Sequence, residues 1–341
     1  MPEKNFDLVI VGAGPAGLTA ALYGARALMT TVVLERGIPG GELLNTEYLE
    51  NFISYPKILG SELAEKFATH AREAGAEIHE FVTVTRVTKR ADGTFETVCD
   101  NGDVYLSPAV IVTAGGTPVK LGIPGEDTFA GRGVSYCAVC DANFFKGHHV
   151  AVAGGGDAAA EESDYLSRYA SKVTLIHRRD SLRASNILQQ RVFENPKITV
   201  VWDTVAEEVL GDGQGLMRAL RLRNVKSGEV SEIDATGLFV FIGFRPNTGV
   251  IDGHYEHDAM GYVLTDYTMM SSIPGLFVAG DMRAQLTRQV TTAAGDGTTA
   301  AIAAEKYIKG LREARAHGGS TQSATECAVE NAHSELGGYA V

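Results

Sequence analysis

Two cysteines, Cys137 and Cys140, are separated by two residues and followed directly by Asp141. A close pair of this kind is typical of thiol–disulfide exchange or of a metal site. Zinc would need two further ligands at a suitable spacing, and the nearest candidates, His148 and His149, do not form such a pattern. We therefore predict a redox-active dithiol and no metal. Asp141 is placed to exchange a proton with it, or, alternatively, to cap a helix or turn.

A glycine-rich fingerprint, Gly12-Ala-Gly14-Pro-Ala-Gly17, precedes the cysteine pair. The predicted elements around it are a strand over 6–11, a helix over 15–28 and a second strand over 31–34. In such a unit the first glycine makes a tight turn, the second admits a pyrophosphate and the third lets helix and strand pack closely. The helix N-terminus favours the phosphates. Glu35 ends the second strand, where a carboxylate binds a ribose hydroxyl, so the pattern predicts a dinucleotide site.

A second fingerprint, Gly154-Gly-Gly156-Asp157-Ala158-Ala, follows the cysteines. It lies between a predicted strand over 149–153 and a helix that runs to about residue 169, and a second strand covers 172–176. That strand ends in basic residues, namely His177, Arg178, Arg179 and, slightly later, Arg183. Guanidinium groups suit a 2′-phosphate, so this site is predicted to bind NADPH. The alternative is a solvated basic turn.

A third signal lies near the end of the chain. A predicted strand over 275–280 stops at Asp281, and a helix follows over about 288–308. An acid at the carboxyl end of a parallel strand can hold a flavin ribitol hydroxyl, and a helix N-terminus favours negative charge on a reduced flavin ring. This segment is predicted to return the chain to its first domain.

The composition limits the classes of function. The chain has 341 residues, 45% of them apolar, and a formal net charge of −12, which argues against nucleic acid or an anionic membrane as partner. Neither a signal peptide nor a membrane span is recognisable, so a cytoplasmic protein is expected. The four cysteines are too sparse for a disulfide framework, and Cys99 is expected in a core.

We predict an α/β fold with two Rossmann-like three-layer nucleotide-binding domains, the second inserted into the first. The predicted parts are 1–117 (FAD-binding, first part), 118–244 (inserted NADPH-binding domain with the cysteines), 245–313 (FAD-binding, second part) and a tail, 314–341. The joints, Gly115-Gly-Thr-Pro118 and Gly243-Phe-Arg-Pro246, could act as a paired hinge. Alternating apolar residues broken by Asp-Gly and Ser-Gly turns predict β meanders over about 81–106 and 199–235.

With these motifs in this order, the sequence resembles the low-molecular-weight thioredoxin reductases up to about residue 312. The segments that carry the resemblance are Gly40-Gly-Glu-Leu, Cys137-Ala-Val-Cys-Asp, Gly154-Gly-Gly-Asp-Ala-Ala, His177-Arg-Arg-Asp, Gly280-Asp281 and Arg288-Gln-Val-Thr-Thr-Ala-Ala-Gly.

The resemblance implies an FAD-containing disulfide reductase that uses NADPH, acts on thioredoxin or a thioredoxin-like protein, and forms a homodimer. It implies that Cys140 lies against the flavin, that Cys137 attacks the partner disulfide, and that the inserted domain rotates between two poses. The predicted FAD-site residues are Gly12, Gly14, Ala16, Gly17, Glu35, Arg36, Gly41, Asn51, Gly115, Asp281, Arg288, Gln289 and Val290. The predicted NADPH-site residues are Gly154, Gly156, Asp157, Ala158, His177, Arg178, Arg179 and Arg183.

Three features depart from the family pattern. Glu42 stands where glutamine is common, and Val290 replaces a smaller residue. The tail over 314–341 could be a short helix on the subunit or on a dimer mate, or a lid that stacks Tyr339 on the flavin, as in related ferredoxin–NADP reductases. A lid would point to a donor other than NADPH, such as ferredoxin or a second flavin. Cys327 stands alone, which argues against a relay thiol.

The leading hypothesis is thus an NADPH-dependent disulfide reductase, and the nearest alternative has the same fold and another donor. A ferredoxin–NADP reductase without a disulfide step would not need Cys137 and Cys140. A flavin-binding redox sensor or scaffold would be the non-enzymatic alternative.

Overall fold

The computed structural model describes residues 3–46, 48–318 and 320–334. The chain divides into two compact units. Unit 1 comprises Met1–Gly116 and Arg245–Val341, and unit 2 comprises Thr117–Phe244. Each unit contains one of the two glycine fingerprints, and unit 2 also contains the cysteine pair.

Unit 1 is built on a five-stranded parallel sheet with the order β21-β10-β2-β3-β6. Its strands are β2 (Leu8–Val11), β3 (Thr31–Leu34), β6 (Glu77–His79), β10 (Ala109–Val112) and β21 (Leu276–Val278). Runs of valine, isoleucine and leucine make β2, β3 and β10 buried on both faces, as parallel strands between two layers must be.

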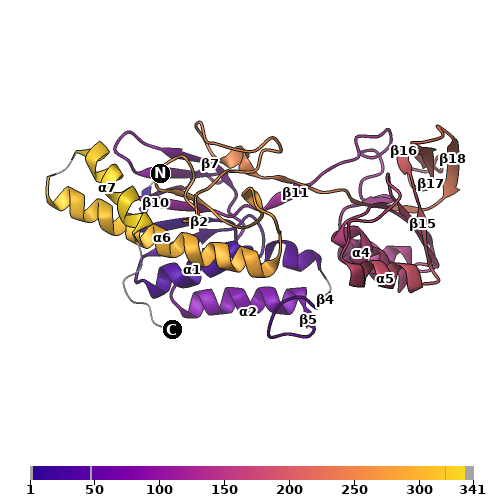
Figure 1. Ribbon diagram of the computed structural model, residues 1–341, viewed down its shortest axis with the longest axis horizontal. Coiled ribbons are helices and arrows are strands. Elements are labelled where there is room, and N and C mark those ends of the chain that lie inside the picture. The colour runs from indigo at the N-terminus through magenta and orange to yellow at the C-terminus, as the bar shows by residue number, and fades with distance from the viewer. Residues whose placement is uncertain (1–2, 47, 319, 335–341) are drawn as a thin grey trace. The chain divides into compact units, whose positions relative to one another are not determined.

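Different layers cover the two faces of this sheet (Figure 1). One core cluster joins the sheet to the helices α1 (Pro15–Arg26), α2 (Gly60–Glu73) and α6 (Val290–Ala316). The other joins it to a second sheet of order β1-β9-β8-β7. The strands of the second sheet are β1 (Glu3–Asn5), β7 (Val84–Lys89), β8 (Phe95–Cys99) and β9 (Val104–Ser107). Cys99 is buried there, which confirms its expected place in a core.

The tail of unit 1 forms a helix, α7 (Thr321–His333), that packs against α6. Three alanines, Ala324, Ala328 and Ala332, are buried in this contact, and Gly310 of α6 leaves room for the backbone of Ala328. The Asn331 amide donates to the carbonyl of Lys306 at 2.7 Å. For the described part of the tail, the prediction of a helix on the subunit is therefore confirmed.

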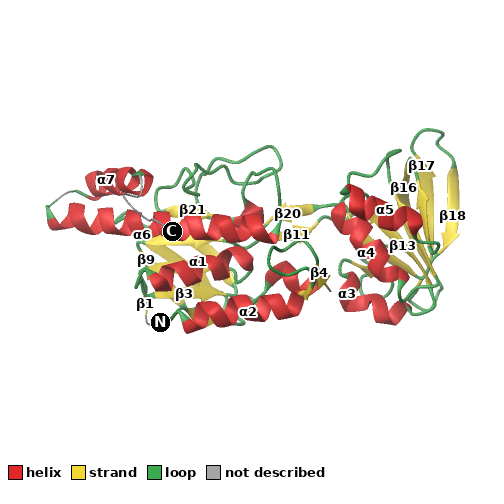
Figure 2. Ribbon diagram, turned by 60° about the horizontal axis from the view of Figure 1, so that its bottom comes forward, coloured by secondary structure: helices red, strands yellow, loops and turns green. Residues whose placement is uncertain are grey.

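Unit 2 repeats the three-layer design (Figure 2). Its parallel sheet has the order β12-β19-β13-β14-β15, with the helices α4 (Asp157–Ser167) and α5 (Asn186–Glu194) on one face. An antiparallel meander of β16 (Thr204–Gly211), β17 (Met217–Asn224) and β18 (Val230–Asp234) covers the other. The sheet strands are β12 (Val134–Ser135), β13 (His149–Gly154), β14 (Lys172–Ile176), β15 (Ile198–Val201) and β19 (Gly237–Phe241). The α/β fold and both meanders are as predicted.

The two chain crossings between the units form a two-stranded ribbon of β11 (Gly116–Pro118) and β20 (Phe244–Pro246). Gly115 and Gly243, which flank it, have φ angles of 60° and 133°. Glycine adopts such angles at the lowest cost, which favours it at both joints.

Several predicted boundaries are wrong by a few residues. The first helix ends at Arg26 rather than Leu28, because Leu28 takes a φ of 59° and leaves the helix. The helix after Asp281 continues to Ala316, eight residues beyond its predicted end at 308. The shorter elements are η1 (Gly41–Asn45), β4 (Tyr48–Leu49), β5 (Ile58–Leu59), α3 (Ala138–Asp141), η2 (Ala142–Phe145), η3 (Thr248–Val250) and η4 (Gly280–Met282). Over the described ranges, every helix is too short or too polar to cross a bilayer.

Candidate functional site

The first glycine turn joins β2 to α1 in unit 1. Gly12 has a φ of 100°, and a Cβ there would lie 2.7 Å from the carbonyl oxygen of Thr113. A Cβ at Gly17 would lie only 1.9 Å from the carbonyl oxygen of Gly12. The turn is therefore packed so closely against β10 and α1 that only glycine fits at these two positions.

The space above this turn fits a dinucleotide phosphate. A Cβ at Gly14 would meet no atom within 4 Å, and Gly14 caps α1 without a side-chain hydrogen bond. The first N–H groups of α1 are thus available to an anion. Gly41 borders this space, since its Cβ would lie 3.1 Å from the Cα of Gly14, and Ala16 is buried in the first turn of α1.

Glu35, at the end of β3, is tied to the same turn. Its carboxylate accepts hydrogen bonds from the backbone N–H of Ala13 at 2.7 Å and of Gly37 at 2.9 Å. An ionised carboxylate has about four acceptor positions, so capacity remains for ribose hydroxyls. The neighbouring Arg36 is exposed.

Asp281 lies in η4, three residues after the end of β21, and is half-buried. Burial raises the pKa of this carboxyl, and the nearby carboxylates of Glu42 and Asp296 act in the same direction. Arg288 opposes the shift by its charge. The Arg288 guanidinium itself lies 4.0 Å from the centre of the Tyr262 ring, within cation–π range. The site therefore holds an acid whose charge is costly until a hydrogen-bond donor arrives.

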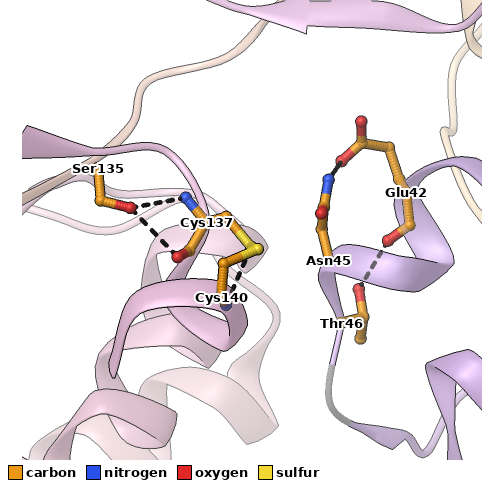
Figure 3. The surroundings of a disulfide bond; sticks show 6 residues. All are labelled: Glu42, Asn45, Thr46, Ser135, Cys137 and Cys140. Carbon is orange, nitrogen blue, oxygen red and sulfur yellow. Dashed lines mark hydrogen bonds between the residues drawn. A yellow bond between two sulfur atoms is a disulfide. The ribbon is translucent and has the colours of Figure 1, made fainter. Parts of the chain in front are cut away.

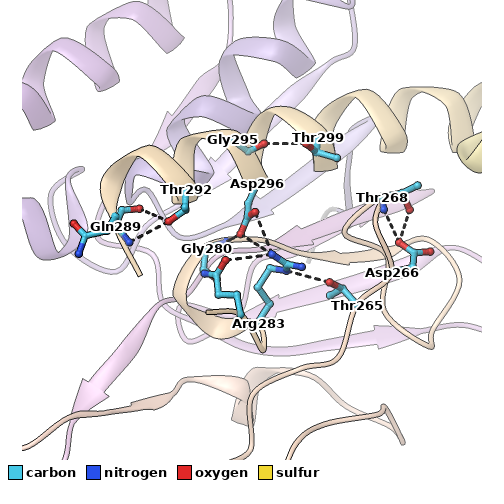
Figure 4. Close-up of polar contacts among 11 residues, drawn as sticks. Thr265, Asp266, Thr268, Gly280, Arg283, Gln289, Thr292, Gly295, Asp296 and Thr299 are labelled. Carbon is cyan, nitrogen blue, oxygen red and sulfur yellow. Dashed lines mark hydrogen bonds and ion pairs between the residues drawn. The ribbon is translucent and has the colours of Figure 1, made fainter. Parts of the chain in front are cut away.

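A buried ion pair fixes the turn that carries Asp281 (Figure 4). Asp296 of α6 accepts a hydrogen bond from the backbone N–H of Gly280 at 3.1 Å and pairs with Arg283 at 3.2 Å. Burial raises the pKa of Asp296, against the charge of Arg283. The sequence motifs did not single out Arg283 or Asp296; the only signal was a charged residue within an alanine- and glycine-rich helix.

The N-terminus of α6 gathers further predicted residues. Gln289 forms a capping box with Thr292, and its side-chain oxygen accepts a hydrogen bond from the Asn51 amide at 2.9 Å. Val290 opens the helix and packs on a small cluster around Leu43. A Cβ at Gly115 would be in open space. The predicted residues 51, 289 and 290 are therefore neighbours, although Asn51 and Gln289 are 238 positions apart in the sequence.

The second glycine turn joins β13 to α4 in unit 2. A Cβ at Gly154 would lie 2.5 Å from the Cβ of Ala159, whereas a Cβ at Gly156 would meet nothing within 4 Å. Like Gly14, Gly156 caps its helix without a side-chain hydrogen bond. The open space and the free N–H groups of α4 again fit a phosphate.

His177 lies beneath this turn and is buried. Its Nδ1 is 2.8 Å from the carbonyl oxygen of Gly154, and its ring fills the space that a Cβ at Gly155 would need. Its Nε2 is buried without a hydrogen-bonding partner among the described residues. His177 thus supports the turn from below, an arrangement that the basic run in the sequence did not reveal.

The arginines that follow His177 remain exposed at the turn. The backbone N–H of Arg183 donates to the carbonyl of Gly155 at 2.7 Å, which holds the arginine loop against the glycine turn. Within the described ranges, no ion pair involves the guanidinium of Arg178, Arg179 or Arg183. Asp157 accepts from the N–H of Ser185, and Ala158 is exposed. Three uncompensated guanidinium groups beside a phosphate-sized space suit a second phosphate.

Cys137 and Cys140 form a disulfide at the start of the short helix α3 (Figure 3). Cys140 is exposed and Cys137 is half-buried. The backbone N–H of Cys140 points to the Sγ of Cys137 at 3.2 Å. Ser135 holds the backbone of Cys137 at both groups, since its Oγ accepts from the N–H at 3.1 Å and donates to the carbonyl at 3.2 Å.

Asp141 directly follows the disulfide on α3 and is half-buried. Its side chain makes no capping hydrogen bond to η2, so the alternative interpretation of Asp141 as a cap is not supported. Across the described part of the chain, no three His, Cys, Asp or Glu side chains are grouped as metal ligands.

Two of the residues considered in the sequence belong to the tail. Cys327 is an exposed free cysteine on α7. Tyr339, the predicted lid residue, lies outside the described residues.

Comparisons with known proteins agree with this site. The family model for pyridine nucleotide-disulphide oxidoreductases matches residues 6–297, and the chain belongs to this family.

Relatives from two bacteria and one solved structure are all thioredoxin reductases. Those of Listeria innocua and Bacillus subtilis are each 43% identical, over 92% and 91% of this chain and 97% of their own length. The crystal structure of Lactococcus lactis thioredoxin reductase is 42% identical, with a TM-score of 0.86 over 89% of this chain and 99% of that one. The family uses FAD and NADPH as cofactors, and the chain is a flavoprotein-type oxidoreductase whose redox-active disulfide is Cys137–Cys140.

Proposed function

We propose that the protein transfers electrons from NADPH, by way of FAD and the Cys137–Cys140 disulfide, to thioredoxin. The observation that carries the proposal is the disulfide of unit 2, present in the same unit as a glycine turn bordered by three unpaired arginines. Relatives that bear the name thioredoxin reductase at 43% identity support the choice of partner.

FAD, when bound, supplies two-electron exchange between a reduced nicotinamide and a disulfide. In the proposal, the first glycine turn and the α1 N-terminus hold its pyrophosphate, and Glu35 its adenosine ribose. Asp281, Arg288 and the α6 N-terminus face the rest of the cofactor. The second glycine turn holds the NADPH pyrophosphate, and Arg178, Arg179 and Arg183 its 2′-phosphate.

The disulfide chemistry then lies with the two cysteines. Two electrons and two protons convert Cys137–Cys140 into a dithiol. The thiolate of Cys137 attacks the thioredoxin disulfide, forming a mixed disulfide and releasing one thioredoxin thiolate. Cys140 next attacks the Sγ of Cys137, which restores the original disulfide and releases the second thiol. The N–H of Cys140 favours a thiolate on Cys137, and Asp141 is the proposed proton donor and acceptor.

A rotation of unit 2 is part of the proposal. The NADPH turn and the disulfide both belong to unit 2, and both must reach the same flavin. The glycines that flank the two crossings, Gly115 and Gly243, support a paired hinge. Cross-links that fix one pose should block turnover; unchanged turnover in cross-linked protein would exclude the rotation.

Anaerobic stopped-flow titration tests the proposal as a whole. We expect NADPH to bleach the flavin, and oxidised thioredoxin to restore its absorbance. The Cys140→Ser variant should keep the bleaching by NADPH and lose the thioredoxin-dependent recovery. A flavin that ferredoxin reduces and NADPH does not would instead favour the alternative donor.

A homodimer and a cytoplasmic location belong to the proposal; sedimentation tests the former and cell fractionation the latter.

A further inference from the structure

A buried carboxylate lies near the start of unit 2. Glu126 is only 2% exposed. It accepts hydrogen bonds from the backbone N–H of Leu121 at 2.9 Å and of Gly122 at 2.7 Å. Its third donor is the hydroxyl of Tyr136, at 2.8 Å. A carboxylate withdrawn from water is retained only with several donors, and Glu126 has three.

Tyr136, which donates the hydrogen bond to Glu126, lies next to the redox disulfide in the sequence. Tyr136 directly precedes Cys137, and its ring packs into the core between the sheet of unit 2 and the meander. Burial raises the pKa of Tyr136, as does its bond to Glu126, so the hydroxyl stays protonated and donates. Before it, β12 pairs with β19, and Ser135 holds the backbone of Cys137.

The turn that carries Glu126 is also fixed by backbone contacts within unit 2. The turn over 121–126 begins two residues after Val119, whose N–H donates to the carbonyl of Gly243 at the crossing. The carbonyl of Pro124 accepts from the N–H of Val209 on β16, and a Cβ at Gly125 would lie 2.3 Å from the carbonyl oxygen of Val209. Glu126 therefore links the segment that enters unit 2 to the residue before Cys137.

We propose that Glu126 and Tyr136 are positioning residues for the redox disulfide. They fix the backbone before Cys137, so that after reduction its sulfur stays close to that of Cys140. The inference deepens the proposed function and rests on it, because it assigns these residues a role in the exchange step. In this role both residues act through the backbone before Cys137 and exchange neither electrons nor protons with the disulfide.

The consequence concerns the thiol–disulfide equilibrium. With glutathione, the oxidised pair and two glutathione thiols yield the dithiol and one glutathione disulfide, so bonds, electrons and protons balance. Closure of the protein disulfide is favoured in proportion to the effective concentration of one thiol near the other. A loosened Cys137 lowers that concentration, and the pair becomes easier to reduce.

The test is an equilibrium measurement on the holoenzyme. Wild type, Tyr136→Phe and Glu126→Gln are equilibrated anaerobically in glutathione buffers of stepped ratio. Thiols are alkylated, and the peptide with Cys137 and Cys140 is quantified by mass spectrometry. We expect both variants to shift the equilibrium about tenfold toward the dithiol, which corresponds to a potential about 30 mV less negative. In Glu126→Gln the new amide group faces the N–H of Gly122, which loses its acceptor, whereas Tyr136→Phe removes the hydroxyl bond. Because both changes weaken the same link, the double variant should shift the equilibrium by less than the two single shifts combined.

Two controls separate positioning from general loss of stability. Tyr165→Phe removes another tyrosine hydroxyl bond of unit 2, to Tyr169. Asp212→Asn weakens another carboxylate that accepts two backbone N–H groups, those of Gln214 and Leu216. Both should leave the equilibrium within twofold of wild type. The melting temperatures of all variants are measured alongside, to compare any shift in the equilibrium with the loss of stability.

An equilibrium unchanged in Tyr136→Phe would overturn the inference, as would equal shifts in the controls. If Glu126→Gln fails to fold, the result for Tyr136→Phe is enough to test the inference. The Tyr136→Phe variant leaves both backbone hydrogen bonds of Glu126 in place. The measurement uses neither NADPH nor thioredoxin. If the protein fails to pass electrons to thioredoxin, the proposed function is wrong. That result would not decide the role of Glu126 and Tyr136, which the glutathione equilibrium tests separately.

Discussion

The two glycine turns, one in each unit, share a plan and differ in the charge beside them. Both join a buried parallel strand to a helix whose first N–H groups are free, and both have one glycine with open space above it, Gly14 and Gly156. In unit 1 the neighbouring charge is the carboxylate of Glu35, bound to the turn by the N–H of Ala13. In unit 2 it is a set of exposed guanidinium groups after His177.

This difference indicates how one architecture is adapted to two nucleotides. A carboxylate bonded to the backbone is fixed in advance and accepts ribose hydroxyls at little entropic cost. Exposed arginines are held only through their backbone, so their side chains become ordered when a phosphate binds. We therefore expect tight, permanent binding in unit 1 and reversible, phosphate-dependent binding in unit 2.

The largest effect is expected from filling the closest contact of the first turn. In Gly17→Ala the new Cβ would lie 1.9 Å from the carbonyl oxygen of Gly12, so α1 must move away from the turn. The free energy of unfolding should fall by about 3 kcal/mol, and the purified protein should lack flavin absorbance. Urea unfolding of the apoprotein and the visible spectrum measure both.

Gly14→Ala is the matched control for that change. Its Cβ meets no protein atom and its backbone is ordinary, with a φ of −75°. The stability of the apoprotein should stay within about 0.5 kcal/mol, while flavin affinity falls because the methyl group occupies the phosphate space. Equal losses of stability in both variants would contradict the description of the turn.

A large and selective effect is expected from removing the arginines of unit 2. Replacing Arg178, Arg179 and Arg183 with alanine should raise the KM for NADPH about 100-fold and leave kcat and the KM for NADH nearly unchanged, given about 1.5–3 kcal/mol for a hydrogen bond to a charged group. The matched control removes three arginines of β17 that pair with glutamates, namely Arg218, Arg221 and Arg223. If the control raises the KM for NADPH equally, only the net charge matters.

A smaller effect, with a pH signature, is expected at Asp281. Because its pKa is raised in the folded protein, the folded state binds the proton more tightly than the unfolded state. Stability of the apoprotein is then lost as pH rises from about 4, the unfolded value, through the higher folded one. Asp281→Asn should abolish this loss, so that the variant apoprotein equals wild type at pH 3 and exceeds it at pH 7.

The same substitution should weaken flavin binding about tenfold, since it removes one charge-assisted hydrogen bond. Thermal unfolding of both apoproteins across this pH range, with flavin titration at pH 7, measures the two effects. A variant apoprotein less stable than wild type at pH 7 would show that Asp281 supports the fold rather than the cofactor.

Local patterns predicted the parts of the molecule that depend on local chemistry. Glycine turns, buried β-branched strands and Asp-Gly hairpins each follow from a few adjacent residues, so both nucleotide units and both meanders were predictable. The helix α2 was missed, although its buried Leu63, Ala64, Ala68 and Ala71 follow helical spacing. No glycine motif marks it, and its polar residues outnumber its apolar ones.

The missed site residues are those whose partners lie far away in the sequence. Asp296 meets Gly280 and Arg283 only after α6 packs beside β21, and Glu126 meets Tyr136 only after the turn over 121–126 docks on β16. His177 was predicted among the cofactor contacts, yet its ring lies under the glycine turn because Gly155 leaves room for it. Pairings of this kind depend on tertiary packing rather than on spacing.

The helix α7 has a practical consequence for anyone who shortens the chain. It lies beyond the residues that match the family model, which makes it an obvious part to delete. Its removal would uncover Gly310 and the surrounding side chains of α6 that now contact Ala324 and Ala328, and would leave Asp266 without His333. An exposed helix surface made of small apolar residues favours association between two copies of the protein. A protein truncated before α7 would then aggregate when it is concentrated, even if its flavin chemistry is intact.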